Sequence, residues 1–495
     1  MDTTWTKGDS PHNLTGPVLV NYGVTLTIEA GAIVKFNDYY MLVNGTLVAV
    51  GSGTDPIHFN GGNITFTQYS NGWNEQTGSG CIIENVIINQ TSLFSGSNSL
   101  KINNNTITGE ISVGESSVVS NNIITGVITG NSPLISNNNI TAGVTYSYDM
   151  FGRPHEVYVA INISGSSVLS NNIITGTMSV GGSSVISNNT ITGELHAESS
   201  VISGNALTGG GTVYDFIGRT MFPRSVLYIS GDSVVANNTI TSQGGGYGIT
   251  VETDCDAYIA DNIISGFVMG IDAAGKATIE RNLILDNGGG IAIGKIPFSY
   301  SPIVIGEGEI IIRDNTIENS SVGIGGPVVN TNTGISVDAV FTSTATIERN
   351  LIINNTVEIE LSSQVTIYNN TITNSSVAIK LGSGLSTAIK YNNIENYGEN
   401  SIYLEGSSSN IDATYNWWGT TDTQAINMTI HDYKYDFDLG KVTFVPFLTE
   451  PNPEAMPISE FSSWIILPIF ITATISALII KKSYFIHLHK NNIFV

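Results

Sequence analysis

A short phrase recurs along this chain: a small or polar residue, Asn, one further residue and then Ile. It reads Ser-Asn-Asn-Ile-Ile at 120–124, Glu-Arg-Asn-Leu-Ile at 280–284 and Tyr-Asn-Asn-Thr-Ile at 368–372. Adjacent anchors lie 16 to 24 residues apart, or 33 to 35 apart where an anchor is skipped or a loop is inserted. Periods of this size indicate a solenoid, in which each coil packs only against its neighbours. The anchors are Asn105, Asn122, Asn138, Asn172, Asn189, Asn205, Asn238, Asn262, Asn282, Asn315, Asn350 and Asn370, and the same phase extends to Asn85, Asn392 and Asn416.

The segments between anchors alternate branched apolar with polar residues, as in 277–284, which is the periodicity of strands. Asn suits the turns between strands, because it tolerates left-handed backbone and hydrogen-bonds local backbone groups. In coils stacked about 4.8 Å apart, identical Asn amides can also bond to one another as a ladder, with Ile columns sealed inside. The pattern therefore predicts an all-β, single-stranded parallel β-helix. A β-propeller would need longer blades with their own signatures, and leucine-rich repeats would show Leu columns.

Both ends of the repeat carry further marks. The segment Val24–Phe36, the phrases 42–47 and 56–59, and Tyr-Asn-Trp-Trp-Gly at 415–419 resemble the first and closing coils of right-handed parallel β-helix surface proteins. The resemblance spans roughly residues 18–448 and implies right-handed coiling, which periodicity alone does not. It implies little about activity, because this architecture hosts lyases, hydrolases and adhesins.

The C-terminal region differs in composition from the repeat. Residues 463–480 form an uncharged run of eighteen residues, just long enough to cross a bilayer, and Lys481 and Lys482 follow it. Positive charge on that side predicts a cytoplasmic C-terminus and an extracellular β-helix at the cell surface. The run, with the Ile-Ser-Glu-Phe segment before it, resembles the anchors of archaeal surface proteins. A buried helix or a removable sorting tail is the alternative.

These boundaries divide the chain into five parts. We expect a lead-in over 1–23, the β-helix over 24–448, a Pro-containing spacer over 449–462, a transmembrane helix over 463–480 and a short basic tail over 481–495. An exported domain needs a leader, and the first residues show no basic start or apolar core. We therefore expect that the natural leader is missing from this sequence; a cytosolic protein is the alternative.

Charge and cysteine content limit the partners. The net charge of −23 and pI of about 4.5 leave no basic stripe for nucleic acid. Cys81 and Cys255 fall many coils apart, so we expect buried thiols rather than a bridge. No metal-ligand spacing stands out, and we expect no cofactor.

Many Asn-x-Ser/Thr sequons suggest an extracellular glycoprotein. We expect glycosylation at a few exposed sequons and none at ladder positions. The sequons begin at Asn13, Asn44, Asn63, Asn89, Asn104, Asn139, Asn162, Asn188, Asn237, Asn319, Asn354, Asn369, Asn374 and Asn427.

One loop is duplicated at an offset of 66 residues, with the coils that follow it. The first copy contains Tyr148, Asp149 and Arg153, and the second contains Tyr214, Asp215 and Arg219. Both loops should project from the same face, about 15–20 Å apart if three or four coils intervene. Aromatic, Asp and Arg side chains suit a glycan-binding platform. The simpler alternative is an Asp–Arg pair that closes each loop while Tyr packs on the coil.

Catalytic machinery is not evident. The Asn-Thr-Asp, Gly-His-Gly and Arg-Ile-Lys motifs of polygalacturonase-like hydrolases are missing from the sequence. Glu358 and Glu360, which we expect on one strand face, form the best paired-carboxylate candidate. The sequence therefore favours a non-enzymatic, structural or glycan- and envelope-binding surface protein. The alternative is a cell-surface lyase or glycoside hydrolase acting on acidic polysaccharide, which three or more carboxylates beside an Arg or Lys on one face would favour.

Overall fold

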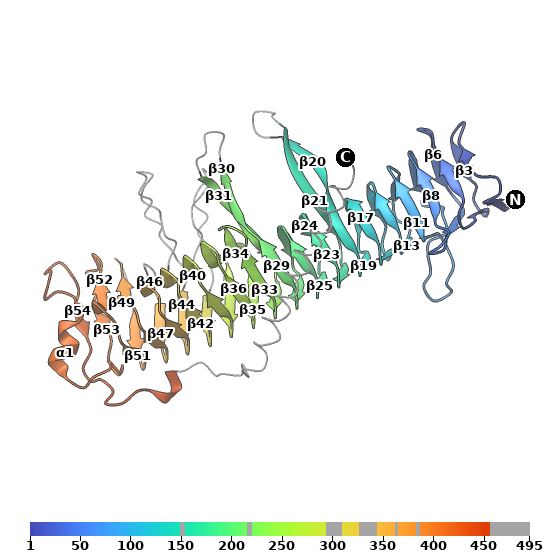
Figure 1. Ribbon diagram of the computed structural model, residues 1–495. Coiled ribbons are helices and arrows are strands. Elements are labelled where there is room, and N and C mark those ends of the chain that lie inside the picture. The colour runs from blue at the N-terminus through green and yellow to red at the C-terminus, as the bar shows by residue number, and fades with distance from the viewer. Residues whose placement is uncertain are drawn as a thin grey trace. The chain divides into compact units, whose positions relative to one another are not determined.

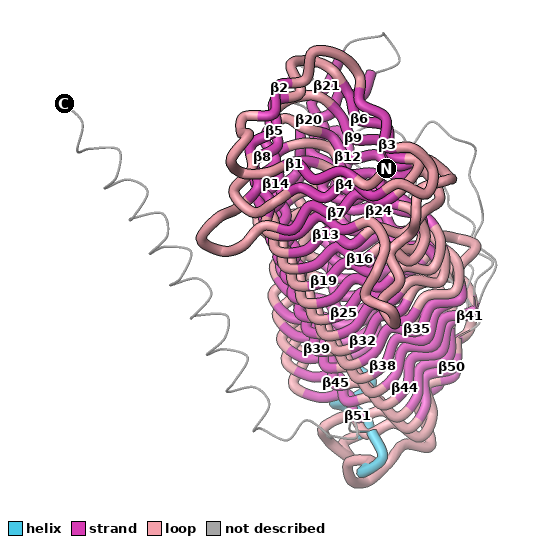
Figure 2. Tube along the Cα trace, turned by 90° about the vertical axis from the view of Figure 1, so that its right-hand side faces the viewer, coloured by secondary structure: helices cyan, strands magenta, loops and turns pink. Residues whose placement is uncertain are grey.

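The structure, a computed structural model, describes residues 1–148, 154–214, 220–293, 309–325, 344–361, 365–382 and 387–455. Short strands follow one another around each coil, and each pairs in parallel with its counterpart in the next coil. The pairing builds three strand stacks that run along the β-helix (Figure 1). Figure 2 shows the strands of successive coils lying over one another. The prediction of an all-β parallel β-helix is confirmed.

The first stack lies directly before the anchor asparagines in each coil. It contains β1 (Thr3–Trp5), β4 (Thr25–Ile28), β7 (Thr46–Val50), β10 (Ile82–Glu84), β13 (Lys101–Asn103), β16 (Val118–Ser120), β19 (Leu134–Ser136), β22 (Val168–Ser170), β25 (Val185–Ser187), β28 (Val201–Ser203), β32 (Val234–Ala236), β35 (Asp256–Ala260), β38 (Lys276–Glu280), β41 (Glu309–Arg313), β44 (Thr344–Glu348), β47 (Val365–Tyr368), β50 (Ala388–Lys390), β53 (Ile411–Asp412) and β55 (Val442–Thr443).

The second stack follows the anchors. It contains β2 (His12–Asn13), β5 (Ile33–Lys35), β8 (Ile57–Asn60), β11 (Val86–Asn89), β14 (Thr106–Thr108), β17 (Ile123–Gly126), β20 (Asn139–Tyr148), β23 (Ile173–Thr175), β26 (Thr190–Thr192), β29 (Ala206–Gly209), β33 (Thr239–Ser242), β36 (Ile263–Ser265), β39 (Leu283–Leu285), β42 (Thr316–Glu318), β45 (Leu351–Ile353), β48 (Thr371–Thr373) and β51 (Asn393–Glu395).

The third stack completes each coil. It contains β3 (Val18–Val20), β6 (Tyr40–Val43), β9 (Asn63–Phe66), β12 (Ser92–Ser95), β15 (Ile111–Val113), β18 (Ile128–Asn131), β21 (Pro154–Ser164), β24 (Thr177–Val180), β27 (Leu195–Glu198), β31 (Thr220–Ser230), β34 (Tyr247–Val251), β37 (Met269–Ala273), β40 (Gly289–Ile293), β43 (Val322–Gly325), β46 (Val357–Leu361), β49 (Val377–Leu381), β52 (Asn400–Leu404) and β54 (Ile430–His431).

A few elements stand outside the stacks. Strand β30 (Gly211–Tyr214) forms a hairpin with β31, helix α1 (Thr423–Met428) lies near the last coils, and the 3-10 turn η2 (Pro453–Ala455) ends the described chain. No helix within the described ranges is long and apolar enough to span a bilayer. The predicted membrane segment 463–480 and tail 481–495 lie outside those ranges, as does the spacer from residue 456. Residues 3–20, expected as a lead-in, supply the first strand of each stack.

A continuous ladder of asparagine amides joins the coils. The side-chain Nδ2 of Asn105 donates to Oδ1 of Asn122, and Nδ2 of Asn122 donates in turn to Oδ1 of Asn138. The series continues without a break to Asn416. All of these side chains are buried. Asn85 does not belong to the ladder, because the backbone N–H of Val86 is the group that bonds to Asn105. Asn85 instead has a φ of 54°, the left-handed corner conformation that precedes each rung.

That corner explains where several sequons fall. Asn104, Asn188 and Asn237 each have positive φ, stand one position before a rung and are exposed. Their glycosylation remains a prediction.

Branched apolar residues fill the interior in columns. Ile102, Val119, Ile135, Leu169 and Ile186 succeed one another in the first stack, and all are fully buried. Burying each such side chain stabilises the fold by about 1.5–3 kcal/mol. The two cysteines are free and buried as expected, and burial raises the pKa of each thiol to about 11.

Candidate functional site

Two hairpins rise from the β-helix on the same side (Figure 1). In one, β20 pairs antiparallel with β21, and in the other β30 pairs antiparallel with β31. Strands β24 and β27 lie between them in the third stack, since β21, β24, β27 and β31 pair in that order. Three strand spacings therefore separate the bases of the hairpins, about 14 Å.

Of the loop residues chosen from the sequence, only Tyr148 and Tyr214 lie in the described part of the chain. Asp149, Arg153, Asp215 and Arg219 lie outside the described residues. Tyr148 and Tyr214 end the ascending strands, where the backbone of Tyr148 pairs with Pro154 and that of Tyr214 with Thr220. The glycan-platform hypothesis for these six residues stays a prediction.

A polar and aromatic cluster lies at the base of the second hairpin. It consists of Glu194, His196, Arg224 and Tyr228, which we call the inter-hairpin cluster. A guanidinium nitrogen of Arg224 donates to the Glu194 carboxylate at 2.9 Å, and His196 Nε2 lies 3.6 Å from its other oxygen. The rings of His196 and Tyr228 are 5.3 Å apart. Four side chains from two adjacent coils thus meet on one outward face.

Exposure differs across the cluster. The side chains of Arg224 and His196 are 57% and 46% exposed, whereas that of Glu194 is only 20% exposed. Burial alone would raise the pKa of Glu194, but the contacts from His196 and Arg224 outweigh burial and lower that pKa. Glu194 is therefore held as an anion that orients its two neighbours. Arg224 keeps further N–H donors for a ligand, because a guanidinium has five.

Sequence reasoning missed this cluster, since His196 has no partner at ligand spacing along the chain. Glu194 lies two positions before it, but Arg224 and Tyr228 become its neighbours only through coil register, which pairs His196 with Tyr228 across 32 positions. The duplication held a partial signal. At the 66-residue offset, Arg224 corresponds to Tyr158 and Tyr228 corresponds to Asn162, so the two copies differ at the positions that form the cluster.

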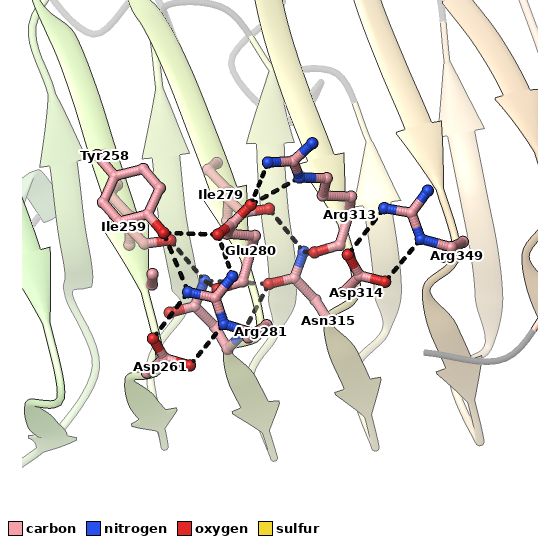
Figure 3. A network of polar contacts seen from close by, with 12 residues as sticks. Tyr258, Ile259, Asp261, Ile279, Glu280, Arg281, Arg313, Asp314, Asn315 and Arg349 are labelled. Carbon is pink, nitrogen blue, oxygen red and sulfur yellow. Dashed lines mark hydrogen bonds and ion pairs between the residues drawn. The ribbon is translucent and has the colours of Figure 1, made fainter. Parts of the chain in front are cut away.

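A second polar array follows the corner of later coils (Figure 3). We call it the ion-pair edge; it contains Tyr258, Asp261, Glu280, Arg281, Arg313, Asp314, Glu348, Arg349 and Tyr368.

Arginines and carboxylates alternate from coil to coil along this edge. Arg281 donates to both oxygens of Asp261 at 2.9 and 3.0 Å, and Arg349 does the same to Asp314. Arg313 donates to buried Glu280 at 2.6 Å, and Arg281 also contacts Glu280. Asp261, Arg281, Asp314 and Arg349 occupy the left-handed corner, with φ of 57°, 54°, 56° and 50°. Most earlier coils have Asn at this corner and one has Gly204, so ion pairs here take the place of neutral residues.

The ion-pair edge gathers at least three carboxylates beside arginines, which is the arrangement that would favour an enzyme. However, Glu280 accepts from Tyr258, Arg281 and Arg313, and these bonds lower its pKa against the raising effect of burial. An ionised carboxylate that already accepts from three donors is poorly suited to exchange a proton with a substrate. The edge links successive coils through ion pairs. Within the described residues, no group of three or more His, Cys, Asp or Glu side chains could hold a metal ion.

The paired-carboxylate candidate does not form. Glu358 is fully buried and its carboxylate accepts from Asn355, whereas Glu360 faces outward and pairs with Lys380 at 2.9 Å. The expectation that both lie on one face was wrong. Position 358 has no register partner between Val357 and Ile359, and Glu358 and Ile359 are both buried, so the inside–outside alternation is lost there.

Comparisons with known proteins bear on the fold. The family model described as "Right handed beta helix region" matches residues 224–417. A solved crystal structure, that of a mutant of the periplasmic alginate epimerase AlgG, matches at 11% identity and a TM-score of 0.27, covering 70% of this chain and 75% of that one. No curated protein sequence matches. The family match supports the parallel β-helix and the handedness that the resemblance implies.

Proposed function

We propose that this chain is a membrane-anchored cell-surface β-helix protein that binds polysaccharide across the inter-hairpin cluster. The observation that carries the proposal is that exposed Arg224 and His196 both contact an anionic Glu194, with the ring of Tyr228 packed against that of His196. Aromatic faces provide apolar area for sugar rings, and a guanidinium provides directional donors for hydroxyl or carboxylate oxygens.

An acidic polysaccharide is the ligand class that we propose. The chain has only 18 Lys and Arg against 41 Asp and Glu, so the exposed guanidinium of Arg224 is one of the few cationic groups that such a ligand could meet. A uronate carboxylate could accept from the N–H groups of Arg224 that Glu194 does not use. The hairpins on either side would direct an extended polymer across β24 and β27.

Anchoring is the second part of the proposal. It rests on the uncharged run 463–480 and the lysines that follow. If the run spans the bilayer, the protein should stay in the membrane fraction after carbonate washing, and external protease should degrade the β-helix in intact cells. Release by carbonate or protection from protease would contradict this part.

The enzymatic alternative would use the same cluster. His196 and Tyr228 carry groups that can transfer protons, and Arg224 can neutralise a uronate carboxylate. A lyase would release unsaturated products from acidic polysaccharide and a hydrolase would release reducing ends. Either product, lost in His196→Ala, would favour this alternative over simple binding.

Retention on immobilised polysaccharides tests the binding proposal. The full chain should be retained on at least one acidic polysaccharide, and the His196→Ala/Arg224→Ala variant should lose that retention at least tenfold. The control variant Lys7→Ala/Lys276→Ala removes two exposed, ion-paired cations elsewhere and should bind normally. Equal loss in both double variants would indicate general charge attraction and would refute the assignment of the site.

A further inference from the structure

The outward face of the second stack carries an unbroken column of threonines. Coil register aligns these residues directly over one another through seven successive coils. We call the set the threonine column; it consists of Thr108, Thr125, Thr141, Thr175, Thr192, Thr208 and Thr241. Asn89 precedes it and Ser265 follows it in the same register.

A parallel column lies two positions earlier in each strand and carries no charge either. It consists of Ile87, Thr106, Ile123, Asn139, Ile173, Thr190, Ala206, Thr239 and Ile263. Ile123 and Ile173 are 56% and 55% exposed, which is unusual for isoleucine. In a chain with net charge −23, this is a long uncharged face.

The array is regular in two directions. Successive coils repeat about every 4.8 Å, and the two columns are about 6.6 Å apart along the strand, twice the rise per residue. Threonine is stiff about χ1, so its hydroxyl and methyl groups keep these spacings with little loss of side-chain entropy on binding. Such a surface matches a ligand that is itself periodic in two dimensions.

We propose that this face binds the surface of ice. Oxygen atoms on the prism planes of hexagonal ice also repeat in rows at two spacings, the shorter near the coil repeat and the longer somewhat larger than the distance between the two columns. Hydroxyls can join the water lattice while the methyl groups of Thr and the exposed Ile side chains order the water between them. Charged side chains would hold their own hydration shells against the lattice, and neither column contains one.

The composition of the columns separates ice from two other partners. A protein surface that binds crystalline polysaccharide would be expected to carry aromatic rings, and both columns lack them. A second copy of this chain would need a larger apolar interface, since stable dimers bury about 800 Å² on each partner and a whole column here consists of hydroxyl side chains.

Partition into slowly growing ice tests the proposal. The purified full chain, made in a host without N-glycosylation so that Asn139 is unmodified, should be enriched in the ice fraction several-fold over a non-binding reference protein. Thr125→Lys/Thr175→Lys should abolish the enrichment, because both substitutions place a charge in the centre of the face. The matched control Gln76→Lys/Gln424→Lys adds the same charge at exposed positions elsewhere and should keep it.

Thermal unfolding of each variant shows that the fold is retained. Exclusion of the unsubstituted chain from ice, to the extent of the reference protein, would overturn the proposal. Binding to crystalline cellulose or chitin without ice enrichment, or dimers that the threonine substitutions dissociate, would overturn it in favour of those partners. The outcome is independent of the inter-hairpin cluster, which lies on the third stack.

Discussion

The side-chain amide of Asn172 donates to Oδ1 of Asn189 at 2.9 Å, although 17 positions separate them in the chain. The same Asn189 oxygen also accepts the backbone N–H of Asn172. One buried side chain thus satisfies two donors of the preceding coil, and its own amide continues to Asn205. The same atoms therefore hold successive coils together and provide hydrogen-bond partners for the backbone at the corner.

Asn189→Ala should therefore destabilise the β-helix strongly. The substitution leaves the buried backbone N–H of Asn172 without its acceptor, and it removes the Asn189 amide that donates to the backbone carbonyl of Leu169 and to Oδ1 of Asn205. Each unsatisfied group costs about 1–3 kcal/mol. We expect a loss of about 2–5 kcal/mol in denaturant unfolding. Thr190→Ala, one position later and exposed, should change stability little; an equal loss in both variants would argue against the ladder.

Glu280→Ala tests the ion-pair edge. It leaves Arg281, Arg313 and the Tyr258 hydroxyl without the carboxylate they share, and breaking a buried ion pair costs about 3–5 kcal/mol. Thermal unfolding should show the loss at neutral pH. Because the native pKa of Glu280 is lowered, its contribution is complete above the unfolded pKa and is lost as pH falls towards the native pKa. A stability difference between Glu280→Ala and the parent that does not shrink in acid would contradict this role.

Glu358 should give the opposite pH dependence. Burial raises its pKa from 4.5 to about 8, although Asn355 donates to the carboxylate. Between these values the native state binds a proton that the unfolded state does not, so stability should fall as pH rises from about 4.5 through 8. Glu358→Gln keeps the shape and removes the titration, so its stability should change less over this interval. An identical pH profile in the parent and the variant would show that Glu358 is ionised in the native state.

The duplicated loops allow a separate test of the hairpin tips. Arg153→Ala plus Arg219→Ala should abolish retention on polysaccharide without unfolding, if the tips take part in the platform that the sequence suggests. Normal retention in this variant, with loss in His196→Ala/Arg224→Ala, would confine binding to the base of the hairpins.

Much of the fold could be predicted because identical positions stack on one another. The repeated sequence phrase alone was enough to place Asn122, Asn189 and Asn282 at equivalent positions of their coils, because a ladder needs the same side chain in every coil. Asn85 was assigned one position early, because the first coil of the series has Val86 where the later ones have Asn. Glu358 was assigned to the wrong face, because two consecutive residues, Glu358 and Ile359, are buried and the apolar–polar sequence does not reveal this.

The candidate site was less predictable, for a physical reason. Glu194 and Arg224 are 30 positions apart because the second hairpin is inserted within one coil, after β29, and Arg224 belongs to the hairpin strand β31, which pairs with β27. Spacing along the sequence indicates which residues are neighbours within a coil, or between coils of constant length. An insertion changes the length of a coil, so this spacing no longer identifies the neighbours. Tyr148 and Tyr214 could be identified from the sequence because the duplication repeats whole segments. The inter-hairpin cluster could not, because Arg224 and Tyr228 lie where the two copies differ.

Hydroxyl-radical footprinting of the full chain with its polysaccharide ligand tests the central claim most directly. The account predicts that bound polymer protects His196 and Tyr228, while exposed aromatic residues far along the chain, such as Tyr435 and Phe437, stay reactive. Protection of Tyr435 and Phe437 with His196 and Tyr228 unchanged would contradict it.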